Sequence, residues 1–384
     1  MAALGFDRIK HSSSFFLGLI ATVLVAAGIV AFPILCIPEN LSPKFAIDLS
    51  KEDISAAKKT IRRFCFDKKP EEEGSVKHCI YQAELYAEIR HLYHGDAIFF
   101  LDGIITSVNG QLTYFNKDMS SRRTYPVSSS WIDAIDEEGI IVYGNRYHQL
   151  GIVSLDENLN IISNYVIKTS DALMIDPTIT RVGDTYYITE TEIRGNVNNK
   201  YPNLPCGTYT VGFYRSDDLV NWEHVTDIMT VGRNIEDITM RFDDGRFLMF
   251  YEDEELDRAA STICVRSSLD YRGNAWGESI VLLESEVGQD QEPAAVERTD
   301  YGYRLFYSSD LEEPGRAYMG GRMYYADFDE DFRLLQRDVP ILGDTETGIL
   351  LNDVLLEEEN SWYLINRNLD TSWDMAVDVT AAES

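Results

Sequence analysis

The sequence predicts an all-β fold, a five-bladed β-propeller preceded by a transmembrane helix and a short helical stalk or cap. The main observation is a repeated hairpin unit with an acidic or amide residue at its head and an aromatic residue 11 positions later. The heads are Asp176, Glu236, Glu292 and Asn352, which are 60, 56 and 60 residues apart. Such a period is typical of radial repeats. Helical patterns do not alternate with these strand patterns, which argues against a βαβ fold.

The N-terminal region is expected to place residues 1–14 in the cytoplasm and to cross a membrane with residues 15–37. This apolar run of 23 residues is long enough for a hydrocarbon core of about 30 Å. Arg8 and Lys10 precede it, so the rest of the chain should be extracellular, periplasmic or in the secretory lumen. A cleaved signal peptide is the alternative, but the run is long for one and ends without a small-x-small cleavage site.

Residues 38–96 are expected to form a stalk and a helical cap. Four apolar residues recur at helical spacing there: Ile54, Ala57, Ile61 and Phe64. A second helical segment is expected over residues 81–93. These helices should pack against the repeat domain.

Export would place four cysteines in an oxidising compartment. Cys65 and Cys79 flank a charged loop and are expected to form a local disulfide. The remaining pair would be Cys206 and Cys264. Four cysteines permit three pairings, so the other two connectivities stay open.

The propeller is expected to occupy residues 97–384. Turn signals divide most of this range into five units: about 128–170, 171–233, 234–289, 290–344 and 345–384. The last unit is too short for four strands, so the segment 97–126 is expected to supply the missing strand and close the ring. Closure of this kind removes exposed sheet edges.

The net charge of −30 limits the partners. An acidic surface repels the phosphates of nucleic acids and anionic lipid heads, so nucleic-acid binding is not expected. The charge suits a solvated surface or an acidic groove for neutral or cationic ligands. The acidic runs 252–257 and 357–359 are expected to be solvated loops.

Two motifs resemble a known enzyme superfamily. D-P-T-I-T-R-V-G-D-T-Y-Y begins at Asp176, and Y-R-S-D-D-L-V-N-W-E ends at Glu223. Together they resemble the five-bladed propeller glycosidases of glycoside hydrolase families 43 and 32, which cleave arabinan, xylan and fructan. The resemblance covers about residues 128–384 and is more specific for the fold than for the substrate. It implies three acidic residues on inner strands, acting as base or nucleophile, pKa-tuning group and general acid.

The repeat geometry agrees with this resemblance, because equivalent positions on inner strands converge on the axis of a propeller. The expected catalytic residues are Asp176 as base, Glu236 as tuning group and Glu292, in Q-E-P, as acid. Carboxyl groups that share one funnel push their pKa values apart. Glycoside hydrolysis needs that split, with one protonated and one ionised group.

Other assignments of the three catalytic roles to the repeat units stay open. The alternative catalytic carboxylates are Asp133, Asp237 and Asp353. Counting two blades back from Glu236 makes Asp133 the base, and Asp237 can replace Glu236. Counting forward from Asp176 puts Asp353 at the place of the acid. Any single head carboxylate could instead cap its strand or pair with an arginine.

The sequence therefore predicts a membrane-anchored glycoside hydrolase outside the cytoplasm, with an oligo- or polysaccharide as partner. Trp131 and Arg241 are candidate substrate-binding residues, although a tryptophan at a repeat position also fits a core role. No organic cofactor is expected, and carboxylates would suit a structural calcium ion. The alternatives are a non-catalytic glycan-binding or interaction propeller, or a transferase or phosphorylase with a basic cluster in its funnel.

Overall fold

The computed structural model describes residues 61–67, 81–83, 94–116, 120–201, 203–255, 259–343, 349–356, 360–369, 372–377 and 379–381. These residues are strands and turns, with three short 3₁₀ helices: η2 (Asp136–Glu138), η3 (Val197–Asn199) and η4 (Ala317–Met319). Within them, no helix has the length and apolar character needed to span a bilayer. The predicted cytoplasmic tail and transmembrane run, residues 1–37, lie outside the described part of the chain.

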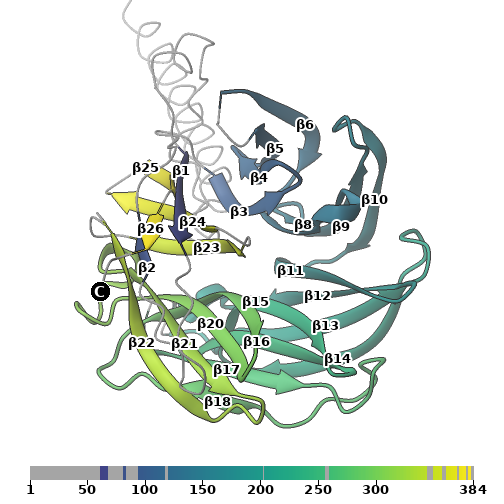
Figure 1. Ribbon diagram of the computed structural model, residues 1–384. Coiled ribbons are helices and arrows are strands. Elements are labelled where there is room, and N and C mark those ends of the chain that lie inside the picture. Colours follow the sequence, from purple (N-terminus) through teal and green to yellow (C-terminus); the bar gives the residue numbers. More distant parts are fainter. Residues whose placement is uncertain are drawn as a thin grey trace, which may run out of the picture. The chain divides into compact units, whose positions relative to one another are not determined.

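Six sheets, which we call blades 1 to 6, follow one another around an axis in chain order (Figure 1). Blade 1 holds β3 (His94–Phe100), β4 (Gly103–Val108), β5 (Gln111–Asn116) and β6 (Arg122–Ser128). Blade 2 holds β7 (Trp131–Ile135), β8 (Ile140–Asn145), β9 (Gln149–Leu155) and β10 (Ile161–Thr169). Blade 3 holds β11 (Leu173–Val182), β12 (Thr185–Arg194), β13 (Thr208–Ser216) and β14 (Glu223–Val231).

Blade 4 holds β15 (Asn234–Asp243), β16 (Arg246–Glu254), β17 (Ser261–Ser267) and β18 (Ile280–Leu283). Blade 5 holds β19 (Gln291–Thr299), β20 (Gly302–Ser309), β21 (Arg322–Asp329) and β22 (Leu334–Gly343). Blade 6 holds β23 (Ile349–Leu356), β24 (Asn360–Leu369) and β25 (Ser372–Val377). The inner strands β3, β7, β11, β15, β19 and β23 each contact the next, and β23 contacts β3, so the ring is closed.

The all-β propeller is confirmed, and each of the five predicted units forms one sheet, blades 2 to 6. The ring holds one sheet more than the five predicted, because blade 1 is a sixth sheet formed by residues that precede the first predicted unit. The segment 97–126 differs from its expected role as a single closing strand, because it contributes most of blade 1. Two tight turns explain the difference. Leu101–Gly103 and Asn109–Gly110 separate β3, β4 and β5 into successive hairpins, as Asp-Gly and Asn-Gly pairs commonly do.

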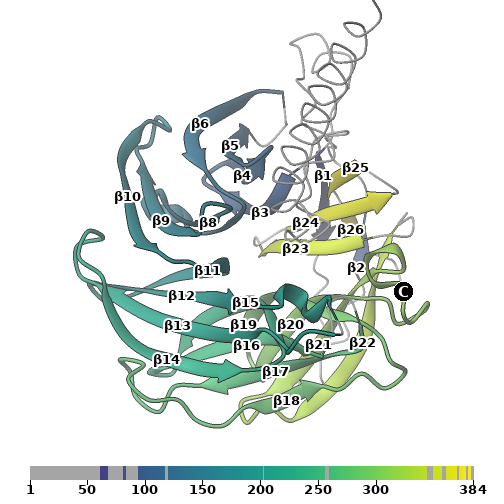
Figure 2. The same ribbon diagram turned by 180° about the vertical axis from the view of Figure 1, so that it is seen from behind.

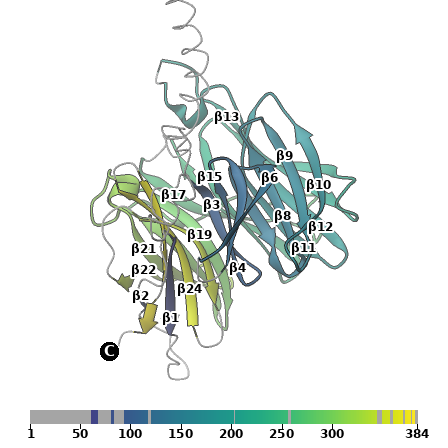
Figure 3. The ribbon, with the colours of Figure 1, turned by 90° about the horizontal axis from the view of Figure 1, so that it is seen from above.

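The closing strand comes from earlier in the chain. β1 (Ile61–Asp67) pairs antiparallel with β24, from Arg63 opposite Leu364 to Asp67 opposite Asn360, and parallel with β25 (Figure 3). Blade 6 is thus built from both ends of the described chain. The helical interpretation is wrong for Ile61 and Phe64, because pairing with an open sheet edge satisfies the backbone of this segment and overrides its helical spacing.

A second early strand extends blade 5. β2 (Tyr81–Ala83) lies between β22 and β26 (Val379–Ala381), parallel to the first and antiparallel to the second (Figure 2). The predicted helix over residues 81–93 is therefore wrong at its first three residues. Residues 51–60 and 84–93, the rest of the predicted helical segments, lie outside the described residues.

Apolar side chains between neighbouring blades form the core. Where blade 6 meets blade 1, Trp362 and Leu364 of β24 pack against Ala97, Phe99 and Ile104. All five are buried, and burying a large apolar side chain stabilises a fold by about 1.5–3 kcal/mol. The ring is therefore closed by apolar packing as well as by strand pairing.

The cysteines do not follow the predicted second pairing. Cys206 and Cys264 are both free, so the Cys206–Cys264 disulfide is wrong. Cys264 is buried in β17, whereas Cys206 is exposed on the loop before β13 of another blade. The predicted Cys65–Cys79 bridge involves Cys79, which lies outside the described residues.

Candidate functional site

A cavity of about 270 Å³ lies on the axis, lined by the inner strands of all six blades. Its wall carries an unusual concentration of acidic residues. They are Asp96, Asp133, Asp176, Asp237, Glu292, Glu297 and Asp353. Among the described residues that line the cavity, none is a lysine, arginine or histidine.

Irregular backbone aims two of these side chains at the axis. The register between β11 and β12 shifts after Ile175, and Asp176 has a φ of 45°. The register between β15 and β16 shifts after Glu236, and Asp237 has a φ of 51°. A β-bulge of this kind redirects a side chain, and a left-handed aspartate is uncommon enough to mark a special position. The bulge places Asp237 in the cavity wall, whereas Glu236 is not among the lining residues.

Four of the acidic residues also join neighbouring blades, since each accepts a hydrogen bond from a backbone N–H of the next inner strand. The pairs are Ile132 N to Asp96 Oδ2 (3.1 Å), Ile179 N to Asp133 Oδ2 (2.8 Å), Asp237 N to Asp176 Oδ2 (2.9 Å) and Phe99 N to Asp353 Oδ2 (2.8 Å). A hydrogen bond contributes about 0.5–1.5 kcal/mol to stability, and about 1.5–3 kcal/mol where the acceptor is ionised. These carboxylates therefore hold the ring together whatever else they do.

Burial controls the protonation of the same groups. It raises the pKa of Asp133 to about 6 and that of Asp353 to about 7. Burial, reinforced by the charge of Asp176, raises the pKa of Asp96 well above its usual range. Burial and the charge of Asp237 do the same to Asp176. A single cavity thus contains carboxyl groups with clearly different proton affinities, the arrangement that acid–base catalysis requires.

These shifts predict a pH-dependent stability. Asp353 binds its proton more tightly in the folded chain than in the unfolded chain, where an aspartate titrates near pH ~3.9. Between about pH 4 and 7 the native state therefore holds more protons, and the free energy of unfolding should fall as pH rises. Asp353→Asn should flatten this slope in urea unfolding between pH 4 and 8. Asp300→Asn, at an exposed turn, should keep the wild-type slope, and equal slopes for all three proteins would contradict the prediction.

The structure brings together most of the predicted site residues. Asp176 and Glu292 line the cavity, as do all three alternative carboxylates, Asp133, Asp237 and Asp353.

The other predicted site residues lie outside the lining. Glu236 pairs with Glu252 in the ladder between β15 and β16. Trp131 is 7% exposed and packed in blade 2. Arg241 donates from Nη1 to Val296 O at 3.1 Å, and its Nη1 lies 3.7 Å from Glu297 Oε2.

Sequence reasoning missed two features of the site. Asp96 precedes an alanine at the start of an inner strand, as Asp133 does, and this repeated Asp-Ala pair was the available signal. Glu252 and Glu254 were expected in a solvated loop, but both are 3% exposed and belong to β16. β16 is buried without a break from Phe247 to Glu252 and again at Glu254, and the apolar run 247–251 that leads into the two glutamates was the available signal.

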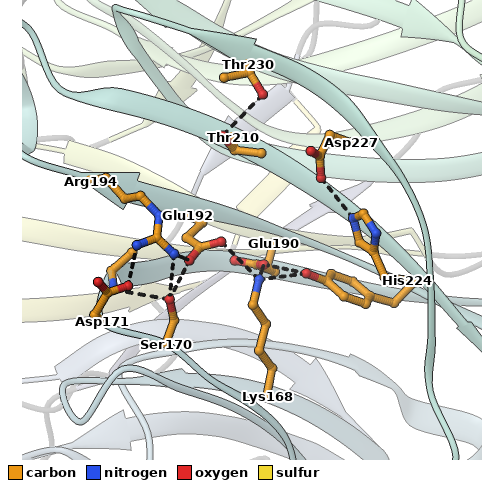
Figure 4. A network of polar contacts seen from close by, with 12 residues as sticks. Lys168, Ser170, Asp171, Glu190, Glu192, Arg194, Thr210, His224, Asp227 and Thr230 are labelled. Atoms are coloured by element: carbon orange, nitrogen blue, oxygen red, sulfur yellow. Dashed lines mark hydrogen bonds and ion pairs between the residues drawn. The ribbon is translucent and has the colours of Figure 1, made fainter.

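A second hollow, of about 440 Å³, lies between blades 2 and 3 and is lined by Lys168, Glu192, Tyr214, Trp222 and His224 among others. Lys168 reaches across from β10, with Nζ 2.8 Å from Glu190 Oε1, 3.0 Å from Glu192 Oε2 and 2.7 Å from Tyr214 OH (Figure 4). Burial opposes the charge of Lys168, but Glu190 and Tyr214 outweigh it and raise its pKa. The ammonium group of Lys168 thus links blade 2 to blade 3.

Comparisons with known proteins give one sequence match with a curated protein and several structural ones. No family model matches the chain. The chain is 25% identical over 223 residues to a xylan 1,3-β-xylosidase from Vibrio sp, a match that covers 53% of this chain and 38% of that protein. The chain therefore spans well under half of the length of this relative. The match agrees with the resemblance drawn from the repeated motifs.

Solved structures of sugar-processing enzymes are similar in fold at low identity. An α-L-arabinofuranosidase from Lactobacillus brevis is 12% identical with a TM-score of 0.46, covering 74% of this chain and 86% of that one. An endo-arabinase from Bacteroides thetaiotaomicron is 11% identical with a TM-score of 0.44, covering 66% and 93%. A β-1,2-mannobiose phosphorylase from Listeria innocua is 14% identical with a TM-score of 0.43, covering 80% and 90%.

Proposed function

We propose that this protein is a glycoside hydrolase that cleaves its substrate in the axial cavity. The observation that carries the proposal is the convergence on one cavity of Asp133, with a pKa of about 6, and of Asp96 and Asp176, whose pKa values lie well above the usual range. Glycosidic bond hydrolysis uses such a pair, one group to protonate the leaving oxygen and the other to activate water or attack the anomeric carbon. The sequence similarity to a xylan 1,3-β-xylosidase points to the same reaction.

We assign the role of general acid to Glu292. It lines the cavity, is 5% exposed, and lies in the Q-E-P motif that resembles the acid position of the propeller glycosidases. A buried carboxyl group retains its proton more readily than an exposed one, as a general acid must.

We assign the role of base to Asp133 in preference to Asp176. With a pKa of about 6, Asp133 is largely ionised at neutral pH, and backbone N–H groups of Ile179 and Ala134 stabilise its carboxylate. Asp176 keeps its proton more strongly, because burial and then the charge of Asp237 raise its pKa well above the usual range. Asp237 then takes the tuning role that the sequence pattern gave to Glu236.

The cavity favours hydrolysis over phosphorolysis. A phosphorylase must hold phosphate, and phosphate sites normally use arginine, lysine or clustered backbone N–H groups. The described wall of this cavity is acidic and contains no basic side chain. Its charge would repel phosphate but admit a neutral sugar.

The full chain should be tested on aryl xylosides and arabinofuranosides and on the corresponding oligosaccharides. Release of free sugar, lost in Asp133→Asn and less affected in Asp176→Asn, is the expected result. Sugar binding without release would replace the proposal with a glycan-binding function. Cleavage that depends on phosphate and yields a sugar phosphate would replace it with a phosphorylase.

We propose that the reaction takes place outside the cytoplasm. The apolar run 15–37 would anchor the chain in a membrane with the propeller on that side. Extraction of membranes with alkaline carbonate distinguishes the cases. A spanning chain stays in the membrane, whereas release into the supernatant would count against the anchor.

A further inference from the structure

Three buried carboxylates gather beside the axial cavity, between blades 4 and 5. Glu252 and Glu254 come from β16, and Asp290 directly precedes β19. One carboxylate oxygen from each lies within 4.8 Å of the others. Their residues are 3%, 3% and 4% exposed. Their burial therefore creates a group of carboxylates that the proposed hydrolytic mechanism does not use.

An unsatisfied atom points to a missing ligand at this place. Oε1 of Glu252 is buried and has no hydrogen-bond partner among the described residues. A buried carboxylate oxygen without a partner costs several kcal/mol in an isolated state and is rare in proteins. Glu252 also belongs to a second group of three, since its carboxylate lies within 4.8 Å of those of Asp237 and Glu292.

We propose that Glu252, Glu254 and Asp290 bind one divalent cation, for which calcium is the best match. Calcium takes six to eight oxygen ligands in flexible geometry, and the three side chains offer carboxylate oxygens only. Magnesium demands near-ideal octahedral geometry and keeps several waters, which suits a buried group of three carboxylates less well. Glu252 supplies the open oxygen, and waters would complete the coordination.

Neighbouring residues already orient two of the ligands. Asn234 Nδ2 donates to Glu254 Oε1 at 3.0 Å, and Ser261 Oγ donates to Asp290 Oδ1 at 3.4 Å. Hydrogen bonds of this kind fix the direction of a metal-binding carboxylate and are as much a part of a metal site as the ligands. A cation here would join β16 to the start of β19 and so tie blade 4 to blade 5.

The experiment uses the full chain stripped with EDTA, without any sugar, so its outcome is independent of hydrolysis. We expect calorimetric titration with CaCl₂ to show one site per chain, and calcium to raise the midpoint of thermal unfolding by several degrees. Titration with MgCl₂ should show affinity at least tenfold weaker. Glu252→Gln keeps the shape of the side chain and should abolish both calcium effects.

Glu255→Gln is the matched control, because Glu255 directly follows β16 but is exposed. It should bind calcium as the wild type does. The proposal is overturned if the wild type shows neither a binding isotherm nor a thermal shift, or if Glu252→Gln binds calcium as tightly as the wild type. A third outcome also overturns the proposal. In it, calcium leaves the unfolding midpoint of both proteins unchanged, and Glu252→Gln unfolds at a higher temperature than the wild type. Removing one carboxylate would then stabilise the cluster without any cation.

Discussion

Glu292→Gln is expected to lower kcat/KM by about 10²–10⁴-fold on a glycoside whose leaving group needs protonation, the usual contribution of a general acid. Glutamine preserves the size of the side chain in its buried place in the cavity wall but has no proton to give. The loss should appear mainly in kcat, because the acid acts in the transition state. Steady-state rates on aryl glycosides measure it directly.

The leaving group provides the control for this prediction. A dinitrophenolate departs without a proton, so Glu292→Gln should retain most of its activity on dinitrophenyl glycosides while losing it on alkyl glycosides and oligosaccharides. Glu236→Gln offers a matched change on a neighbouring inner strand, outside the cavity lining, and should cost much less. Equal losses on all leaving groups would show that Glu292 serves another role, such as base or structural contact.

Asp327→Asn is expected to lower the free energy of unfolding by about 3–5 kcal/mol, the usual cost of breaking a buried ion pair from one side. Asp327 is 0% exposed and Arg304 is 4% exposed. The guanidinium makes two bonds to the carboxylate, Nε to Oδ1 at 2.7 Å and Nη2 to Oδ2 at 2.8 Å. Its centre also lies 4.1 Å from the ring of Tyr325. Asparagine leaves the arginine charge buried in blade 5 without its counterion.

An exposed pair in the same blade provides the control. Arg298 and Glu330 are 34% and 69% exposed, with Nη2 2.6 Å from Oε1. Solvent screening limits such a pair to about 0–1 kcal/mol, so Glu330→Gln should barely shift the midpoint of urea unfolding. If Asp327→Asn unfolds at the same urea concentration as Glu330→Gln, the buried pair does not stabilise blade 5.

Much of the ring could be predicted because each blade repeats one local pattern. An acidic or amide head, an apolar strand, a turn and an aromatic strand recur with nearly constant spacing in four units. These four units and the shorter unit before them all form sheets. Blade 1 lacked the pattern, since no proline follows Asp96 and the residue 11 positions later is Ser107 rather than an aromatic residue. The closing strand β1 could not be found locally, because its partner β24 is distant in the sequence and its own residues have helical spacing.

The candidate site was predictable to within one residue. The sequence placed the heads at Glu236 and Asn352. The bulge after Glu236 puts Asp237 in the cavity wall in its place, whereas in blade 6 both Asn352 and Asp353 line the cavity. A one-residue bulge leaves no clear trace in composition, and it moves a side chain to the other face of the strand. Glu252 was assigned to a loop for a different reason. A run of acidic residues usually marks a solvated surface, but Glu252 and Glu254 at the start of this run are buried in β16.

The way blade 6 is assembled bears on how the chain reaches its native state. The sheet of blade 6 is complete only when β1 pairs with β24, for example Arg63 opposite Leu364. Residue 364 must therefore be synthesised before this pairing can form. Contacts between such distant segments slow folding, and until they form the last sheet presents an unpaired border open to wrong partners. Blades 1 to 4 are built from neighbouring hairpins alone and can form beforehand, so we expect the pairing of β1 with β24 to be among the last and slowest steps of folding.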